Sequence, residues 1–242
     1  MSFGFKIIVE GRYACFTRPE LKVERVSYDV PTPGAIEGML KSIYWKPAIR
    51  YEVDKIVVFN PIKFKSVRRN EVSSKISFSN VKKQMKDDSV DISLYTKDDR
   101  SQRSSMVLAD VKYGIEFHFE LTGLRCEGEE NSEDKHYNII KRRIENGQCF
   151  RTPCLGCSEF VVEKLSMVDK FDLSLISKEI IDSGDVDLGF MSYKVKFDDS
   201  DKLTDKNWEE HQFSDKAKTI FFRPHMIEGI IDVKKYKENI VC

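Results

Sequence analysis

The sequence predicts an α+β fold, because strand-like and helix-like patterns follow one another along its 242 residues as strand, helix, strand, strand, helix, strand. This order is typical of the ferredoxin-like (RRM-like) domain, a fold that RNA-recognition modules use. Hydrophobic residues make up 40% of the chain and include 16 Phe, so a sizeable core can be buried. We expect a ferredoxin-like domain over residues 1–165 and a small β-rich C-terminal domain, with an antiparallel sheet, over residues 166–242.

The first half of the expected domain holds two strands and one helix. Residues 5–9 have the pattern of an opening strand. Thr32 can cap a helix in which apolar residues recur at helical spacing, and Pro47 stops that helix. Residues 53–59 predict the second strand. Residues 61–105 are too many for a simple connection between strands, so we expect an insertion with structure of its own.

The second half continues with a strand, a helix and a strand. Apolar and charged residues alternate within residues 105–121, which predicts the third strand. Ser132 or Asp134 caps the second helix, and Gly147 follows it where a C-terminal cap belongs. Residues 154–164 predict the fourth strand. The buried stripe of the second helix is expected to contain Ile139, Ile140 and Ile144.

The rest of the sequence excludes several classes of protein. No apolar run approaches the roughly 20 residues that a membrane helix needs, and the N-terminus lacks the features of a signal peptide. Six Cys residues without an export signal are expected to be reduced thiols, so we expect a cytoplasmic protein with no membrane partner.

Strand-like stretches at residues 187–197 and 219–233 account for the expected C-terminal domain.

Charge is balanced over the whole chain but not locally, since Lys and Arg together number 40 and so do Asp and Glu. Residues 61–86 contain eight basic side chains and one acidic one, whereas residues 127–134 contain five acidic ones and no basic one. The basic block also contains Phe64 and Phe78, which suits a nucleic acid, because cations pair with phosphates and rings stack on bases. A solvated charged face is the alternative interpretation.

Three cysteines have the opening spacing of a plant-type iron–sulfur site, C-x₄-C-x₂-C, at Cys149, Cys154 and Cys157. A fourth ligand should follow within a few tens of residues, but the next cysteine is Cys242, at the end of the chain. No set of His, Cys and Asp has convincing zinc spacing. We therefore expect structural thiols, no metal site and no cofactor, with an iron–sulfur or redox protein as the alternative.

The expected topology brings three chemically useful side chains together. In a ferredoxin-like domain the end of the first helix and the start of the second lie at the same edge, so Tyr44 would meet Lys135 and His136. A phenol, an ammonium group and an imidazole can cleave RNA without a metal: one group takes the proton of the 2′-hydroxyl, one protonates the 5′-oxygen, and the cation stabilises the phosphate. A packed aromatic ring and solvated side chains are the alternative interpretation.

Six stretches share their residues and their order with one known family. The longest is residues 14–50, ACFTRPELKVERVSYDVPTPGAIEGMLKSIYWKPAIR. The others are residues 66–72 (SVRRNEV), 99–113 (DRSQRSSMVLADVKY), 135–136 (KH), 147–160 (GQCFRTPCLGCSEF) and 187–191 (DLGFM). Together they resemble subtype d of the Cas-five family, CRISPR-associated proteins of type I-C systems in the repeat-associated RNA-binding superfamily.

The resemblance implies a modified ferredoxin-like domain with a small C-terminal sheet. It implies a metal-independent endoribonuclease that cuts CRISPR precursor RNA at the base of the repeat hairpin and leaves a 2′,3′-cyclic phosphate. The protein would stay on the 5′ handle of the crRNA, beside the backbone and large subunits of the interference complex (Cascade). The family's catalytic residues match Tyr44, Lys135 and His136, and a role in sensing target DNA rests on the likeness alone.

Two positions depart from the family pattern. Asp134 replaces a Gly before the Lys-His pair, and Ser158 replaces an Arg, whose loss could weaken backbone contact. The alternative function is a non-catalytic scaffold that holds the 5′ handle while another protein cuts. We expect RNA contacts from the cations within or beside the matched stretches, namely Lys22, Arg25, Lys46, Lys63, Lys65, Arg68, Arg69, Arg103 and Arg151.

Overall fold

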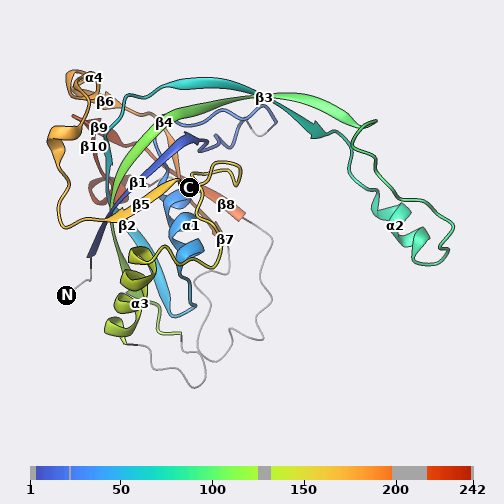
Figure 1. Cartoon of the computed structure of the whole chain (residues 1–242), viewed down its shortest axis with the longest axis horizontal. Helices are drawn as coiled ribbons and strands as arrows, with labels where there is room; N and C mark the ends of the chain where they lie inside the picture. Colours follow the sequence, from blue (N-terminus) through green and yellow to red (C-terminus); the bar gives the residue numbers. More distant parts are fainter. Residues whose placement is uncertain (1–3, 22, 125–131, 198–216, 241–242) are drawn as a thin grey trace.

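Eight strands form one antiparallel sheet in the computed structural model, which describes residues 4–21, 23–124, 132–197 and 217–240. The strand order is β5-β1-β4-β2-β10-β9-β6, and β3 pairs with β4 beside this path (Figure 1). The predicted α+β architecture is confirmed, and its main element is a large antiparallel sheet. The strands of this sheet are β1 (Gly4–Ala14), β2 (Ile49–Val58), β3 (Phe64–Val72), β4 (Arg100–Leu121), β5 (Lys164–Met167), β6 (Asp185–Asp187), β9 (His225–Ile227) and β10 (Ile230–Asp232).

The first helix, α1 (Pro33–Ile43), begins where the sequence predicts. The side chain of Thr32 accepts a hydrogen bond from the Ala35 N–H at 3.2 Å. The helix ends earlier than expected, because Tyr44 donates the last helical hydrogen bond, to the Leu40 carbonyl, and then turns into an extended conformation. Its apolar face is buried and consists of Ile36, Met39, Leu40 and Ile43.

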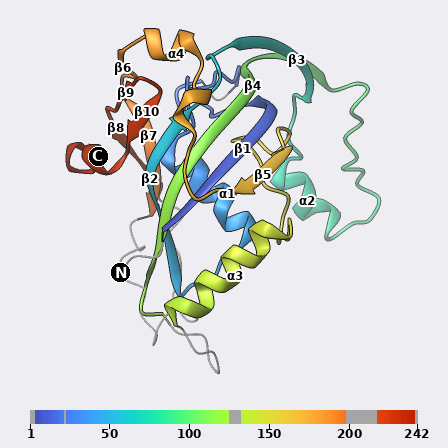
Figure 2. The ribbon, with the colours of Figure 1, turned by 60° about the vertical axis from the view of Figure 1, so that its left-hand side comes forward.

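The second predicted helix, α3 (Glu133–Glu145), lies beside α1 along the sheet (Figure 2). Of the two predicted caps, Ser132 is the correct one, since its hydroxyl accepts from the Lys135 N–H at 3.3 Å. Gly147 follows the helix with φ of 62°, as a C-terminal cap requires. The predicted stripe is confirmed at Ile140 and Ile144, which are buried, and at Ile139, which is partly buried.

The predicted fourth strand is wrong over most of its length, because β5 begins only at Lys164. Residues 154–163 form a loop that runs beside Cys15 at the end of β1. Gly156 has φ of 87° and lies so close to the Cys15 carbonyl that any side chain would collide with it. Leu155 packs into the core, where it is 3% exposed. The apolar residues that suggested a strand therefore anchor an irregular loop.

The insertion between the second and third predicted strands has the structure that its length required. Strand β3 pairs with the first part of β4, from Phe64 opposite Leu108 to Val72 opposite Arg100. This hairpin projects from the sheet as an arm with α2 (Phe78–Gln84) near its tip (Figure 1). The 22-residue strand β4 thus belongs to the arm at one end and to the core sheet at the other.

The C-terminal strands are present, but they do not form one sheet of their own. Strands β6, β9 and β10 extend the main sheet along the edge of β2, whereas β7 (Met191–Phe197) and β8 (Ala217–Phe222) pair with each other in a separate sheet. Two short helical segments, η1 (Leu173–Leu175) and α4 (Lys178–Asp182), precede these strands, and η2 (Lys234–Asn239) follows them. The domain boundary at residue 165 stays a prediction. Within the described part of the chain, every helix is too short or too polar to cross a bilayer.

Two carboxylates on β2 hold the C-terminal segment against the sheet. Glu52 accepts a hydrogen bond from Lys237 at 2.8 Å, and it is 8% exposed. Asp54 lies at a β-bulge, 2.9 Å from the Lys234 ammonium group and 2.8 Å from Nδ1 of His118. Because these anions are largely buried, their paired cations are needed to offset the loss of hydration.

The ion pair at Glu52 predicts a pH-dependent contribution to stability. Burial raises the pKa of Glu52, but the hydrogen bond from Lys237 and the nearby charges of Lys194 and Arg50 outweigh burial and lower the pKa below its ordinary value. A carboxyl group with a lowered pKa stabilises the fold above its ordinary pKa, and this contribution is lost as the pH falls through the folded-state value. Glu52→Gln should therefore lower the unfolding free energy by about 1.5–3 kcal/mol at pH 7 and by less near pH 3.

Denaturant unfolding at both pH values checks this prediction. Glu120→Gln is the matched control, because the Glu120 carboxylate pairs with Arg50 on the surface and should contribute little. An equal loss of stability at pH 7 and pH 3 in Glu52→Gln would contradict the ionic explanation.

Candidate functional site

Tyr44 and His136 meet at the edge of the sheet where α1 ends and α3 begins. The Tyr44 hydroxyl lies 2.9 Å from Nδ1 of His136, and the two ring centroids are 5.9 Å apart. The residues are 92 positions apart in the sequence. Both side chains are buried, with exposed fractions of 3% and 0%. The structure thus brings together two of the three predicted catalytic residues in direct contact.

Lys135, the third predicted residue, precedes His136 in the first turn of α3. Its side chain is half-buried, whereas that of His136 is fully buried. Consecutive helical residues point about 100° apart, so the two side chains leave the helix in different directions. The N–H groups of this first turn and the positive end of the α3 dipole lie at the same helix end as Lys135 and His136. Asp134, which departs from the family pattern, is exposed in the same turn.

Two residues that sequence reasoning missed fix the position of Tyr44. The Arg143 guanidinium group donates to the Ile43 carbonyl at 2.6 Å and lies over the Tyr44 ring, 5.1 Å from its centroid. The Tyr51 hydroxyl donates to the Tyr44 carbonyl at 2.7 Å. Burial raises the pKa of Tyr51, so this donor stays protonated. These contacts satisfy the carbonyls of Ile43 and Tyr44, which lie where α1 ends and intrahelical partners run out.

The Tyr44–His136 pair is suited to moving protons. Either ring nitrogen of a neutral imidazole can carry the proton, so Nδ1 either accepts from the phenol or donates to its oxygen. The Phe119 ring stands edge-on to His136, with centroids 6.2 Å apart, and together with the Arg143–Tyr44 contact it restricts how the two rings can move. A phenol and an imidazole held in this way can act as a general acid and a general base.

Four predicted RNA-binding cations, which we call the β3 cations, lie on β3 or, in the case of Lys63, directly before it, and they form two groups. Lys63, Lys65 and Arg68 are exposed at the base of the arm and along it. Lys65 donates to the Tyr13 hydroxyl at 2.8 Å, which keeps its ammonium group close to an aromatic ring. Arg69 differs, because its side chain turns toward the body of the protein. The exposed group is the part of the basic block that a phosphate backbone can reach.

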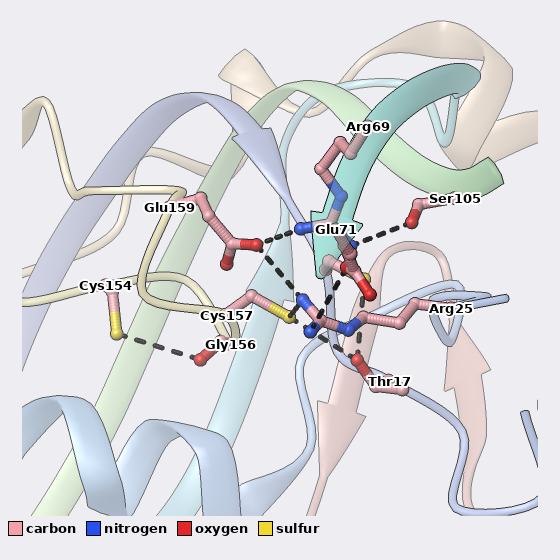
Figure 3. A network of polar contacts seen from close by, with 10 residues as sticks. Thr17, Arg25, Arg69, Glu71, Ser105, Cys154, Gly156, Cys157 and Glu159 are labelled. Atoms are coloured by element: carbon pink, nitrogen blue, oxygen red, sulfur yellow. Dashed lines mark hydrogen bonds and ion pairs between the residues drawn. The ribbon is translucent and has the colours of Figure 1, made fainter. Parts of the chain in front are cut away.

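Arg25 and Arg69 are instead held by acidic side chains (Figure 3). One carboxylate oxygen of Glu159 accepts from Arg25 at 3.0 Å and also from Arg69. Glu71 pairs with both arginines, at 3.7 and 3.5 Å. Arg69 further donates to the Ser105 hydroxyl at 2.9 Å. The two guanidinium groups therefore tie the arm to the loop of residues 154–163.

The other predicted RNA contacts are spread over the molecule. Arg151 is exposed, and its N–H donates to the Ser42 carbonyl in the last turn of α1, close to Tyr44. Lys46 is half-buried just after α1, and Arg103 is half-buried on β4, opposite Arg69. Lys22 lies outside the described residues.

The cysteines occupy different environments. Cys149 is exposed, Cys154 and Cys157 are half-buried, and Cys15 at the end of β1 is buried. Among the described residues, no three His, Cys, Asp or Glu side chains lie where they could hold a metal ion together. Cys126 and Cys242 lie outside the described residues. Cys157 contacts Thr17 and Arg25, and the spacing of the cysteines did not predict these contacts.

Comparison with known proteins identifies relatives along almost the whole chain. The family model for Cas5d, described as CRISPR-associated protein (Cas_Cas5), matches residues 5–234. The CRISPR pre-crRNA endoribonuclease Cas5d of Mannheimia succiniciproducens is 42% identical over 238 residues, which cover 98% of this chain and 97% of that protein. The protein of the same name from Thermus thermophilus is 34% identical over 239 residues, with 96% and 93% covered.

A solved structure described as a CRISPR-associated protein has the same fold. It matches with a TM-score of 0.57 and 22% identity, and the match covers 96% of this chain and 91% of the other. The arrangement of strands and helices described above is therefore shared with an experimentally determined structure.

Proposed function

Because the chain belongs to the Cas5d family of CRISPR-associated proteins, we propose that it is an endoribonuclease that cleaves CRISPR precursor RNA at the base of the repeat hairpin. Two relatives that match nearly its full length carry the name pre-crRNA endoribonuclease. The observation that carries the proposal is the direct contact of Tyr44 with His136 in the turn of α3 that also holds Lys135.

The proposed reaction is a transesterification that needs no metal ion. The 2′-hydroxyl of the RNA attacks the adjacent phosphate, the bond to the 5′-oxygen breaks, and a 2′,3′-cyclic phosphate forms. Tyr44 and His136 supply the base that accepts the 2′-hydroxyl proton and the acid that protonates the leaving 5′-oxygen. Either residue can take either role. The Lys135 ammonium group and the first N–H groups of α3 stabilise the charge that develops on the phosphate.

RNA binding must expose the catalytic pair. Tyr44 and His136 are 3% and 0% exposed in the free protein, and a general acid or base must come within hydrogen-bond reach of the group that it serves. We therefore expect local opening at this edge when the repeat hairpin binds, as occurs in many regulatory complexes. Arg143 and Tyr51 hold the carbonyls of Ile43 and Tyr44, so the backbone at the end of α1 can stay in place while the side chains become accessible.

Residues outside the pair would bind the RNA and the neighbouring subunits. The exposed β3 cations and Arg151 are the part of the predicted set that a phosphate backbone reaches most easily. The strand order β5-β1-β4-β2 with α1 and α3 supports a ferredoxin-like domain, whose last strand ends two residues beyond the predicted boundary at residue 165. The protein would act in the cytoplasm and stay on the 5′ handle within the type I-C interference complex.

The competing function is a scaffold that binds the crRNA 5′ handle without cutting it. Repeat RNA incubated with the protein in EDTA separates the two, because both functions predict binding and only the nuclease yields products. A fluorescence titration on the same samples confirms that the RNA is bound. Bound but uncut RNA, with and without added divalent metal, would favour the scaffold.

Lys135→Ala is expected to weaken binding of the repeat and to slow cleavage of the bound RNA. The ammonium group meets a phosphate in the ground state and meets more charge in the transition state, so both quantities fall. Single-turnover cleavage and equilibrium binding measure them separately. Lys141→Ala, on the exposed side of the same helix, is the control and should change neither. If Lys135→Ala and Lys141→Ala had the same affinity and the same cleavage rate, Lys135 would not be part of the site.

Neutralising the exposed β3 cations should weaken repeat binding and reduce its salt dependence. Replacing Lys63, Lys65 and Arg68 by Gln is expected to lower the slope of log K against log salt by about 0.7–0.9 for each phosphate that the variant no longer neutralises. The control replaces three exposed lysines elsewhere, at Lys170, Lys178 and Lys235. An unchanged slope in the β3 variant would show that these cations form only a solvated face.

A further inference from the structure

Backbone hydrogen bonds hold two cysteines side by side at the end of β1. The Cys15 N–H donates to the Leu155 carbonyl at 3.0 Å, and the Cys157 N–H donates to the Cys15 carbonyl at 3.2 Å. Gly156, the residue before Cys157, has no side chain, which allows its backbone to pass directly against Cys15. The β-bridge pairs Cys15 with Gly156, so Cys157 lies one residue beyond the position directly opposite Cys15.

The two thiols share one hydroxyl group but differ in exposure. Oγ1 of Thr17 lies 3.6 Å from the Cys15 sulfur and 3.5 Å from the Cys157 sulfur. Cys15 is 1% exposed, whereas Cys157 is half-buried and faces the polar network around Arg25 (Figure 3). A small reagent in solution can therefore reach the Cys157 sulfur but not the buried Cys15 sulfur.

The surroundings of Cys157 stabilise its thiolate. The hydrogen bond from the Cys15 thiol lowers the pKa of Cys157, burial opposes this, and Thr17 and Arg25 add to the lowering. The same pairing raises the pKa of Cys15, which therefore keeps its proton. Nη1 of Arg25 lies 3.8 Å from the Cys157 sulfur, while Glu159 and Glu71 hold the guanidinium group in place. Arg69, bound to the same two carboxylates, is the other cation of this network.

We propose that Cys15 and Cys157 form a hydroperoxide-reactive thiol pair that closes to a disulfide, a property separate from RNA cleavage. The Cys157 thiolate attacks one oxygen of hydrogen peroxide, the O–O bond breaks, and hydroxide leaves, so that Cys157 becomes a sulfenic acid. The Cys15 sulfur then attacks the Cys157 sulfur, the S–O bond breaks, and the hydroxyl leaves with the Cys15 proton as water. Two thiols lose two electrons in total, and the peroxide is reduced to water.

Formation of the Cys15–Cys157 disulfide would alter the network of ion pairs that ties the arm to the loop of residues 154–163. The thiolate that faces Arg25 becomes a neutral disulfide sulfur, so Arg25 keeps only Glu159 and Glu71 as charged partners in the described residues. The loop would also gain a covalent bond to the end of β1.

The first test maps thiol reactivity in the full-length protein. After brief alkylation with iodoacetamide and peptide mass spectrometry, Cys157 should react at nearly the same rate at pH 6 and pH 8. An unstructured peptide with one cysteine, added to the same reaction, should slow by about tenfold for each pH unit. Arg25→Gln should make the rate at Cys157 more dependent on pH. Equal pH profiles for the peptide thiol and Cys157 would overturn the proposed thiolate.

The second test uses hydrogen peroxide. The unaltered protein should lose two mass units and give a peptide that links Cys15 to Cys157. Cys15→Ser should instead accumulate a sulfenic acid at Cys157 that dimedone labels, and Cys157→Ser should give neither product. Thermal melts confirm that both variants are folded. Dimedone labelling of Cys149 or Cys154 at the rate of Cys157, or a disulfide between other residues, would overturn the proposal. These outcomes do not depend on cleavage of RNA.

Discussion

Tyr44→Phe is expected to slow cleavage of the repeat RNA by roughly 10²–10⁴-fold while leaving its affinity for the hairpin unchanged. The substitution removes one hydroxyl group, the group that lies 2.9 Å from Nδ1 of His136, and keeps the ring beneath Arg143. His136→Ala should reduce the rate by a similar factor, because it removes the other half of the proton-transfer pair. Single-turnover kinetics with saturating protein measure the rate, and a filter-binding titration measures the affinity.

Tyr28→Phe is the matched control for the loss of a buried hydroxyl group. Tyr28 is 2% exposed, and its hydroxyl oxygen accepts from the Ser192 N–H at 3.2 Å, away from the site. Its removal should cost stability without slowing cleavage. Thermal melts of the variants show whether a loss of activity reflects unfolding. Full activity in both Tyr44→Phe and His136→Ala would place the active site elsewhere.

A single 2′-deoxy nucleotide just upstream of the cut is expected to block cleavage completely and to leave binding intact. In the proposed reaction the 2′-oxygen is the nucleophile, so its removal leaves no group to attack the phosphate. The same substitution one nucleotide downstream is the control and should be cut at nearly the normal rate. Cleavage of the upstream deoxy substrate would show that water is the nucleophile, and the roles assigned to Tyr44 and His136 would then be wrong.

The contact between Tyr44 and His136 could be predicted from the sequence because it depends on topology. The alternation of strands and helices places the end of α1 and the start of α3 at one edge, whatever the details of the loops. Arg143 and Tyr51 could not be identified in the same way. One signal was available, since Arg143 lies seven residues after His136 and so on the same face of α3. The Arg143 side chain donates to the Ile43 carbonyl at the end of α1. This contact depends on how far the side chain reaches, and the spacing of residues in the sequence does not give that information.

The loop of residues 154–163 shows where pattern reasoning failed. Its apolar residues suggested a strand, but Gly156 allows the backbone to pass against Cys15, and Leu155 becomes an anchor in the core. The same loop carries Glu159, which binds both Arg25 and Arg69. A count of basic residues treats all arginines alike. The structure separates those that are neutralised by carboxylates from Lys63, Lys65 and Arg68, which are exposed.

The chemical nature of the new RNA end tests the central claim most directly. After cleavage of the repeat RNA in EDTA, the upstream product can be isolated and weighed by mass spectrometry. Attack by the 2′-hydroxyl, with Tyr44 and His136 moving the protons, predicts a 2′,3′-cyclic phosphate on that product and a 5′-hydroxyl on the downstream one. A 3′-hydroxyl paired with a 5′-phosphate would mean that water attacked the phosphate, and it would contradict the mechanism proposed for this site.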